Sequence, residues 1–300
     1  YTELYAVHRI SPAAYPANPI QNAIDGAGAG DLILVSPGSY EELAIMWKPV
    51  KLQGWGAGSV FLNARQVPTE KIDNWRAKVE ALVTNGSIEL LPGQEFAPTG
   101  FQALGAPLFP TEEGAGIFVA GRSTSASRFN APANRGARID GFTIVGATQG
   151  GGIVLNGYTG YMNIGNNRVI ANAGFYGGGI RLGHPNLSHE EGDGLVYDDA
   201  VNDNVRLYRN QVIKNGNTIA DSAGGGISLY TGADNYRVQK NWVCGNFSQG
   251  GGAGIGHLGY SNNGLIEDNT IIFNESFSQA TAESGGGIYI GCKQLEGAAS

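Results

Sequence analysis

Two short motifs recur along this chain from residue 114 onward, and together they restrict what it can fold into. The first is Gly-Gly-Gly-Ile or a close variant, and its copies end at Ile117, Ile153, Ile180, Ile227, Ile255 and Ile288. The second is Asn-x-Val/Ile-x-x-Asn, and its asparagine pairs are Asn167 and Asn172, Asn210 and Asn215, Asn241 and Asn246, and Asn269 and Asn274. Short motifs in tandem predict a structure built from stacked repeats.

The distance between the two motifs is nearly constant. The isoleucine and the first asparagine are 14 residues apart in the copies that begin at Ile153, Ile227 and Ile255. The copy that begins at Ile180 has a spacing of 30 residues, which adds a 16-residue insertion to the same unit. An earlier copy runs from Ile117 to Gly141, and we expect Gly141 to occupy the first asparagine position. Constant spacing with variable loops predicts successive coils of one winding backbone.

Apolar residues alternate within each unit. Ile153 and Leu155 share one face, and Val154 between them points to the other, as period-two strands require. Each unit has room for three short strands and none for helical crossovers. Glycine permits positive-φ turns between strands, and asparagine side chains can hydrogen-bond from coil to coil. The eight asparagines above are therefore predicted to form structural ladders.

The first 113 residues differ from the repeats. Residues 1–64 predict an N-terminal cap and the first coils, with a short amphipathic helix over residues 19–25 before several apolar strands. Residues 65–113 predict an inserted flap with one helix, because Thr69 can serve as its N-cap and apolar residues then recur at helical spacing. The flap either covers apolar surface of one sheet or forms the wall of a glycan groove.

With this opening and the Gly/Asn repeats behind it, the chain resembles the right-handed parallel β-helix superfamily of pectate-lyase-like proteins. The resemblance implies an all-β fold, a right-handed parallel β-helix (solenoid) in a single domain over residues 1–300, whose short N-terminal helix plugs the open end of the stack. Residues 114–300 form the repeat coils, and we expect the coils to continue beyond residue 300. The superfamily's enzymes are mostly polysaccharide lyases, hydrolases and epimerases that act on the outward face of one sheet.

That outward face carries few groups suited to catalysis in this chain. Its row of residues is Phe118, Val154, Arg181, Ser228, Gly256 and Tyr289. The row has one charge and no carboxylate, whereas a glycoside hydrolase needs two placed carboxylates and a lyase must neutralise an acidic substrate. The row therefore favours a non-catalytic module.

The 16-residue insertion after Ile180 offers an alternative, because it gathers titratable side chains beside Arg181. The catalytic candidates are Arg181, His189, Asp198 and Asp199, and the candidate Ca²⁺ ligands are Glu190, Glu191 and Asp193. The competing interpretation is a solvated acidic loop, since runs of charge usually face solvent.

The charge balance limits the partners. A net charge of −7 argues against a nucleic-acid binder, and no apolar run reaches the ~20 residues of a membrane span. The two cysteines, Cys244 and Cys292, form no motif and predict no disulfide.

Two functional hypotheses follow. The first is a secreted, extracellular or cell-surface scaffold of bacterial type that contacts a polysaccharide and either self-associates end to end at its last coil or continues there as a longer chain. The second is a polysaccharide lyase or uronate epimerase that acts near residues 183–199.

Overall fold

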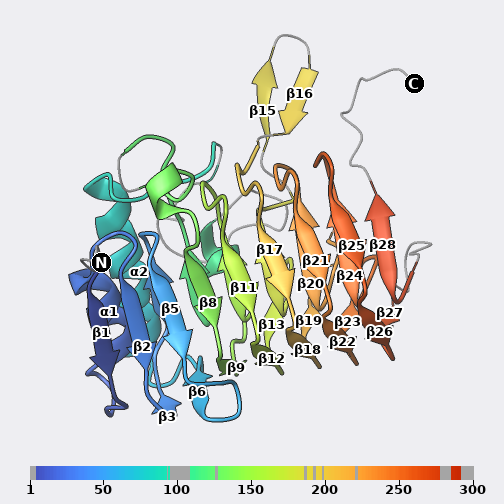
Figure 1. Cartoon of the computed structure of the whole chain (residues 1–300). Coiled ribbons are helices and arrows are strands. Elements are labelled where there is room, and N and C mark those ends of the chain that lie inside the picture. Colours follow the sequence, from blue (N-terminus) through green and yellow to red (C-terminus); the bar gives the residue numbers. More distant parts are fainter. Residues whose placement is uncertain are drawn as a thin grey trace.

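The computed structural model describes residues 5–92, 94, 109–125, 128–185, 188–191, 194–197, 199–219, 222–277 and 285–291. The described chain is predominantly β, with four parallel sheets and two α-helices (Figure 1). The sequence-based prediction of an all-β chain of parallel strands is confirmed at this level. The path of the chain is consistent with a β-helix or solenoid-like fold.

Each of the four sheets runs along the stack, and within each sheet the strands follow one another in chain order. Sheet 1 contains β1 (Val7–Ile10), β2 (Leu32–Val35), β5 (Lys51–Gly54), β8 (Arg138–Asp140), β11 (Asn163–Gly165), β17 (Arg206–Tyr208), β21 (Arg237–Gln239) and β25 (Leu265–Glu267). Sheet 2 contains β3 (Gly38–Tyr40), β6 (Val60–Asn63), β9 (Thr143–Val145), β12 (Arg168–Ile170), β18 (Gln211–Ile213), β22 (Trp242–Cys244) and β26 (Thr270–Ile272).

Sheet 3 contains β4 (Ala44–Met46), β7 (Ile117–Val119), β10 (Ile153–Leu155), β14 (Ile180–Leu182), β20 (Ile227–Tyr230), β24 (Ile255–Leu258) and β28 (Ile288–Gly291). Sheet 4 contains the two-residue strands β13 (Ala173–Gly174), β19 (Gly216–Asn217), β23 (Phe247–Ser248) and β27 (Glu275–Ser276). From β10 the chain enters sheets 1, 2 and 4 in turn and returns to sheet 3 at β14, which pairs with β10 in register from Ile153 and Ile180 onward.

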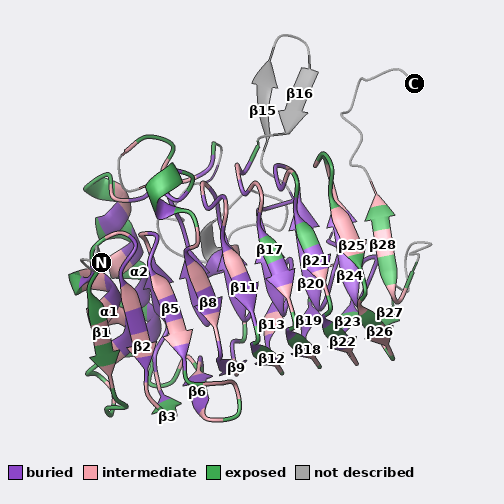
Figure 2. Cartoon of the chain, viewed as in Figure 1, coloured by how far each residue is buried: buried purple, intermediate pink, exposed green. Residues whose placement is uncertain are grey.

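The inward residues of the coils form one continuous apolar core. Ile153, Leu155 and Val169 are fully buried in it, and their equivalents in the next coils lie above them. Figure 2 shows buried residues in purple along the strands in the middle of the stack, whereas β1 and β28 at its two ends are pink and green. His257 takes the inward position next to Leu229, where its Nδ1 lies 3.1 Å from the Tyr236 hydroxyl.

Glycine is required in these blocks for two separate structural reasons. Gly224 and Gly285 open their blocks at φ 81° and φ 74°, in the left-handed region that favours glycine. The last glycine of a block is required by close approach of backbones instead. A Cβ on Gly179 would lie 2.2 Å from the carbonyl oxygen of Gly226, its equivalent in the next coil. The motif thus marks the position where neighbouring coils come closest.

The structure places the eight repeat asparagines in two rows at the ends of the sheet 2 strands. One row is Asn167, Asn210, Asn241 and Asn269, and the other is Asn172, Asn215, Asn246 and Asn274. Within each row the side-chain Nδ2 donates to the Oδ1 of the next coil's asparagine at 2.9–3.2 Å. From the second asparagine of each row onward, the Oδ1 also accepts the backbone N–H of the asparagine one coil earlier.

One expected equivalence is wrong by a residue. Arg168 pairs with Thr143, so Phe142 and not Gly141 lies opposite Asn167. The Phe142 N–H donates to the Asn167 Oδ1 at 3.0 Å, as an asparagine N–H does elsewhere in the row. Gly141 instead takes the preceding turn position, with φ 81°.

The two helices lie on different surfaces of the stack. Helix α1 (Pro19–Gly26) packs against β1, β2 and β4 and buries Ile20 and Ile24 in the main core. Helix α2 (Glu70–Thr84) belongs to a second apolar cluster on the outward face of sheet 3. None of the helices in the described part of the chain is long and apolar enough to cross a membrane.

The remaining elements are short. Two 3-10 helices are η1 (Phe109–Glu112) and η2 (Pro132–Asn134). The insertion after Ile180 contains an antiparallel hairpin, β15 (Ser188–Glu191) with β16 (Gly194–Tyr197), which projects from the stack in Figure 1. Cys244 is a free thiol, and Cys292 lies outside the described residues.

Candidate functional site

The outward row of sheet 3 begins under helix α2. Ile45, Phe118 and Val154 are fully or almost fully buried there, because the apolar side of α2 lies over them. Trp75 from α2 meets Phe118 edge to face, with ring centroids 5.4 Å apart. The flap therefore shields the first strands of this face from solvent.

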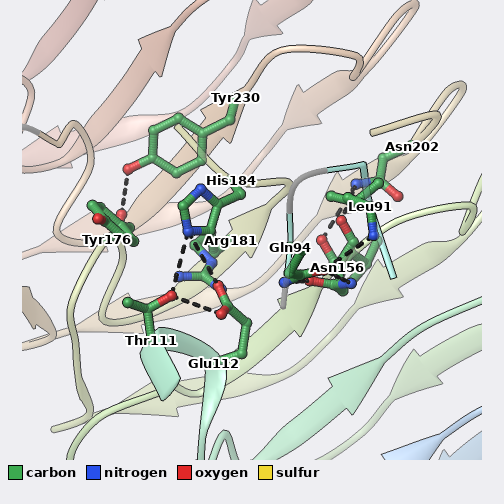
Figure 3. A network of polar contacts seen from close by, with 11 residues as sticks. Leu91, Gln94, Thr111, Glu112, Asn156, Tyr176, Arg181, His184, Asn202 and Tyr230 are labelled. Carbon is green, nitrogen blue, oxygen red and sulfur yellow. Dashed lines mark hydrogen bonds and ion pairs between the residues drawn. The ribbon is translucent and has the colours of Figure 1, made fainter. Parts of the chain in front are cut away.

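Arg181 is the next residue in the row and is also completely buried. Its Nη2 donates to the Glu112 Oε1, and both side chains are 0% exposed. Glu112 comes from η1, at the end of the flap, so this ion pair joins segments 69 residues apart in the chain (Figure 3). Removal of one partner of a completely buried ion pair strongly destabilises the folded protein, because the other charge stays buried and uncompensated.

Two more polar side chains complete the cluster around Glu112. The Thr111 hydroxyl donates to the Glu112 Oε2 at 2.6 Å. The His184 Nε2 lies 3.8 Å from the Glu112 Oε1 and 3.4 Å from the Thr111 hydroxyl. The ring of Tyr176 packs against the imidazole, with centroids 4.7 Å apart. The turn after β14 thus contributes to the same buried network as the flap.

A neighbouring pair of amides ties the flap to the preceding coil. Gln94 and Asn156 exchange two side-chain hydrogen bonds, at 2.8 and 2.9 Å, and both side chains are buried. Asn202, one coil further, donates to the backbone oxygens of Leu155 and Asn156 (Figure 3). These contacts fix the flap over the ends of β10 and β14.

Burial dominates the electrostatics of this cluster. It raises the pKa of Glu112, and the Arg181 guanidinium and the hydrogen bond from Thr111 oppose that rise. The Nε and Nη1 atoms of Arg181 have no hydrogen-bond partner within the described structure. A carboxyl and an imidazole in contact can exchange a proton, but here both side chains and the Arg181 guanidinium are shut off from solvent. The geometry suits a structural contact that holds the flap against the coil.

The structure brings few of the sequence candidates together. Asp199 is exposed, and its Oδ1 accepts the Val201 N–H at 2.6 Å. Burial, with repulsion from Asp199 and Asp234, raises the pKa of Asp203 to about 6. Within the described side chains, the ion pair of Arg181 is with Glu112 and not with Asp199.

The remaining candidates fall on the hairpin insertion. His189, Glu190 and Glu191 lie on β15, although their side chains are not among those described. Asp193 and Asp198 lie outside the described residues altogether. Within the described part of the chain, no three His, Cys, Asp or Glu side chains form a group that could hold a metal ion.

Sequence reasoning missed the partner of Arg181. Glu112 lies in the flap and outside the repeat, so no periodicity placed it near β14. The available signal was the Glu112-Glu113 pair directly before the glycine block at residue 114, where the flap must return to sheet 3. Glu113 is also paired, with Arg76 of α2 at 2.6 Å.

Comparison with known proteins identified no relative of this chain. No family model, no curated protein and no solved structure matches the chain.

Proposed function

We propose that this chain is a non-catalytic β-helix module that serves as a secreted or cell-surface scaffold. In this proposal the four sheets wind as a right-handed parallel β-helix of the pectate-lyase-like type, and α1 closes its N-terminal end. The apolar side of α1 and its contacts with β1, β2 and β4 support the capping role.

The observation that carries the proposal is the closure of sheet 3's outward face. Ile45, Phe118 and Val154 are covered by α2, and the next residue, Arg181, is neutralised by Glu112 beneath the flap. A catalytic residue must touch its substrate, whereas this arginine is 0% exposed. The alternative, a polysaccharide lyase or uronate epimerase near residues 183–199, requires Arg181 to leave Glu112 and the flap to lift.

The assembly part of the proposal rests on the last described coil. β25, β26 and β28 are edge strands. Among the described strands, each pairs with a neighbour on one side only. On β28, Ile288 and Ile290 are 44% and 67% exposed. Unpaired parallel strands with exposed apolar side chains favour pairing with further β structure. We propose that a second copy or further coils cover this end.

Substitutions at the buried ion pair test the scaffold role. Arg181→Met alone leaves the Glu112 carboxyl buried without its cation, and we expect a loss of about 3–5 kcal/mol in the free energy of unfolding. The double variant Arg181→Met/Glu112→Leu removes both charges and should recover most of that loss. Urea unfolding followed by circular dichroism measures both.

An activity assay provides the opposing outcome. The wild-type chain is incubated with uronate polymers, with and without Ca²⁺, and the products are examined for unsaturated or epimerised sugars. The scaffold role predicts no product from any protein in the series. Product from the wild type that disappears in the well-folded double variant would establish the enzyme alternative instead.

A further inference from the structure

The corner between sheets 1 and 2 gathers basic side chains around a hollow. A hollow of about 410 Å³ is lined by Asn163, Arg206, Tyr208, Arg209, Gln239 and Lys240. Arg206 stands on β17, and Arg209 and Lys240 stand on the turns that follow β17 and β21. All three cations are exposed. The lining thus carries three positive charges and no carboxylate, in a chain whose net charge is −7.

These cations have no counter-ion of their own. No ion pair or side-chain hydrogen bond of Arg206, Arg209 or Lys240 occurs within the described structure. Two carboxylates near the hollow already accept hydrogen bonds from amide side chains. Asp140 accepts them from Gln53 and Asn166 at 2.8 and 2.7 Å, and Glu267 accepts one from Gln239. Unpaired charges of one sign around a concavity attract ions of the opposite sign.

The backbone of this corner would more easily accept other residue types. Arg209 and Lys240 have φ of 54° and 57°, in the left-handed region, where asparagine and glycine are the favoured residues. Two earlier coils follow that preference, with Gly141 at φ 81° and Asn166 at φ 55° in the equivalent turns. Long cationic side chains thus occupy two successive turns at which local conformation does not favour them.

A second hollow adjoins the first. It has a volume of about 260 Å³, and its lining includes Asn166, Arg168, Arg209 and Gln211. Arg209 borders both hollows. A ligand that extends around this corner would therefore meet a cation on each side of Arg209.

We propose that this corner is a binding site for a ligand that carries two or more phosphate or sulfate groups. A terminal phosphate or sulfate ester group offers three acceptor oxygens, so Arg206, Arg209 and Lys240 can each donate to it from a different side. The amides of Asn163 and Gln239 lie in the same lining, where the Asn163 Nδ2 donates to the Tyr161 carbonyl and the Gln239 Nε2 donates to the Glu267 Oε1. The second group would lie in the adjoining hollow against Arg168. This site is on a different face from the buried Arg181 cluster, and it does not depend on the scaffold role.

Asparagine substitutions at three turn residues with left-handed backbone test the site. Arg209→Asn and Lys240→Asn each remove one lining cation while placing a favoured residue at a left-handed position. Lys214→Asn is the matched control, because Lys214 is an exposed cation with φ 56° that lines neither hollow. All three variants change the net charge by one unit and should fold at least as well as the wild type.

Binding of pyrophosphate, inorganic phosphate and inorganic sulfate is measured by isothermal titration calorimetry at low and moderate salt. We expect pyrophosphate to bind more tightly than either single anion, and more weakly as salt rises. Arg209→Asn and Lys240→Asn should each raise its Kd about tenfold or more, and Lys214→Asn should change it less than twofold. A preference for phosphate over sulfate, or the reverse, tells which ester the ligand bears.

Two outcomes would overturn the proposal. One is the absence of any pyrophosphate binding by the wild-type chain at low salt. The other is an equal loss of affinity in all three variants, because that would show a response to net charge instead of a site at this corner.

Discussion

Arg181 and Arg209 show how one residue type acquires two different roles in this chain. Both occupy positions in the repeat, but Arg181 is sealed against Glu112 and Arg209 stands exposed at a turn. The difference comes from the flap, whose Glu112 contacts Arg181 of β14, whereas none of its described residues lines the corner between sheets 1 and 2. Arg181 is therefore a buried structural residue, whereas Arg209 is accessible to a ligand.

The acidic turn around Asp203 makes stability depend on pH. The pKa of Asp203 is raised to about 6 from 3.8, so between these values the folded chain binds more protons than the unfolded chain. This contribution to stability is fully present below about pH 4 and is lost as the pH rises through 6. Asp203→Asn should flatten this part of the curve of unfolding free energy against pH.

Urea unfolding at several pH values between 4 and 7 checks this expectation. Asp199→Asn is the companion variant, because Asp199 contributes part of the repulsion that raises the pKa of Asp203. This substitution should therefore remove part of the slope of unfolding free energy against pH. An unchanged slope in Asp203→Asn would contradict the assignment of the pH dependence to this turn.

At the scale of elements, the asparagine rows hold the corners of successive coils together. Asn210 is 1% exposed, and its Nδ2 donates to the Ile164 carbonyl at 2.9 Å and to the Asn241 Oδ1 at 3.0 Å. Asn210→Ala would leave several buried partners unsatisfied, at about 1–3 kcal/mol each. We expect a total loss of roughly 3 kcal/mol or more in the free energy of unfolding.

The same substitution at the end of the row is the control. Asn269 is half-buried, so water can replace part of its hydrogen bonding when the side chain is removed. Asn269→Ala should therefore cost clearly less than Asn210→Ala in the same urea titration. Equal losses would show that the rows contribute little beyond local turn geometry.

The elements also differ in how far sequence predicted them. Helix α2 was expected from Thr69 and a helical stripe, and it runs from Glu70 to Thr84 with that stripe buried. The insertion with the hairpin β15–β16 was interpreted either as a site or as a solvated acidic loop, and neither interpretation included paired strands. Phe142 was missed as the partner of Asn167 because the ladder's backbone bond needs no particular side chain at its donor.

For the whole molecule, the last described coil is the surface most suited to association. Ile290 is 67% exposed on β28, whose outer edge has no neighbour within the described strands. Ile290→Lys places a charge at that edge and should lower self-association of the chain, measured by sedimentation velocity over a range of protein concentrations.

Val67→Lys is the control for this prediction. Val67 is 73% exposed but lies on the segment after β6, away from the last coil. It adds the same charge and should leave the sedimentation profile unchanged. A wild-type chain that stays monomeric at every concentration would contradict the expected self-association.

The repeat motifs by themselves determined the stacked parallel strands of this protein. Glycine blocks and asparagine pairs encode local events, a positive-φ turn, a close backbone approach and a side-chain bond to the next coil, and such events recur wherever the residues recur. The tertiary structure alone decided which outward surfaces stay open. The flap brings Glu112 to Arg181 across 69 residues and seals one face, and the winding of the chain brings Arg206, Arg209 and Lys240 around one hollow. Contacts between distant segments depend on how the whole chain packs, and no local spacing records them.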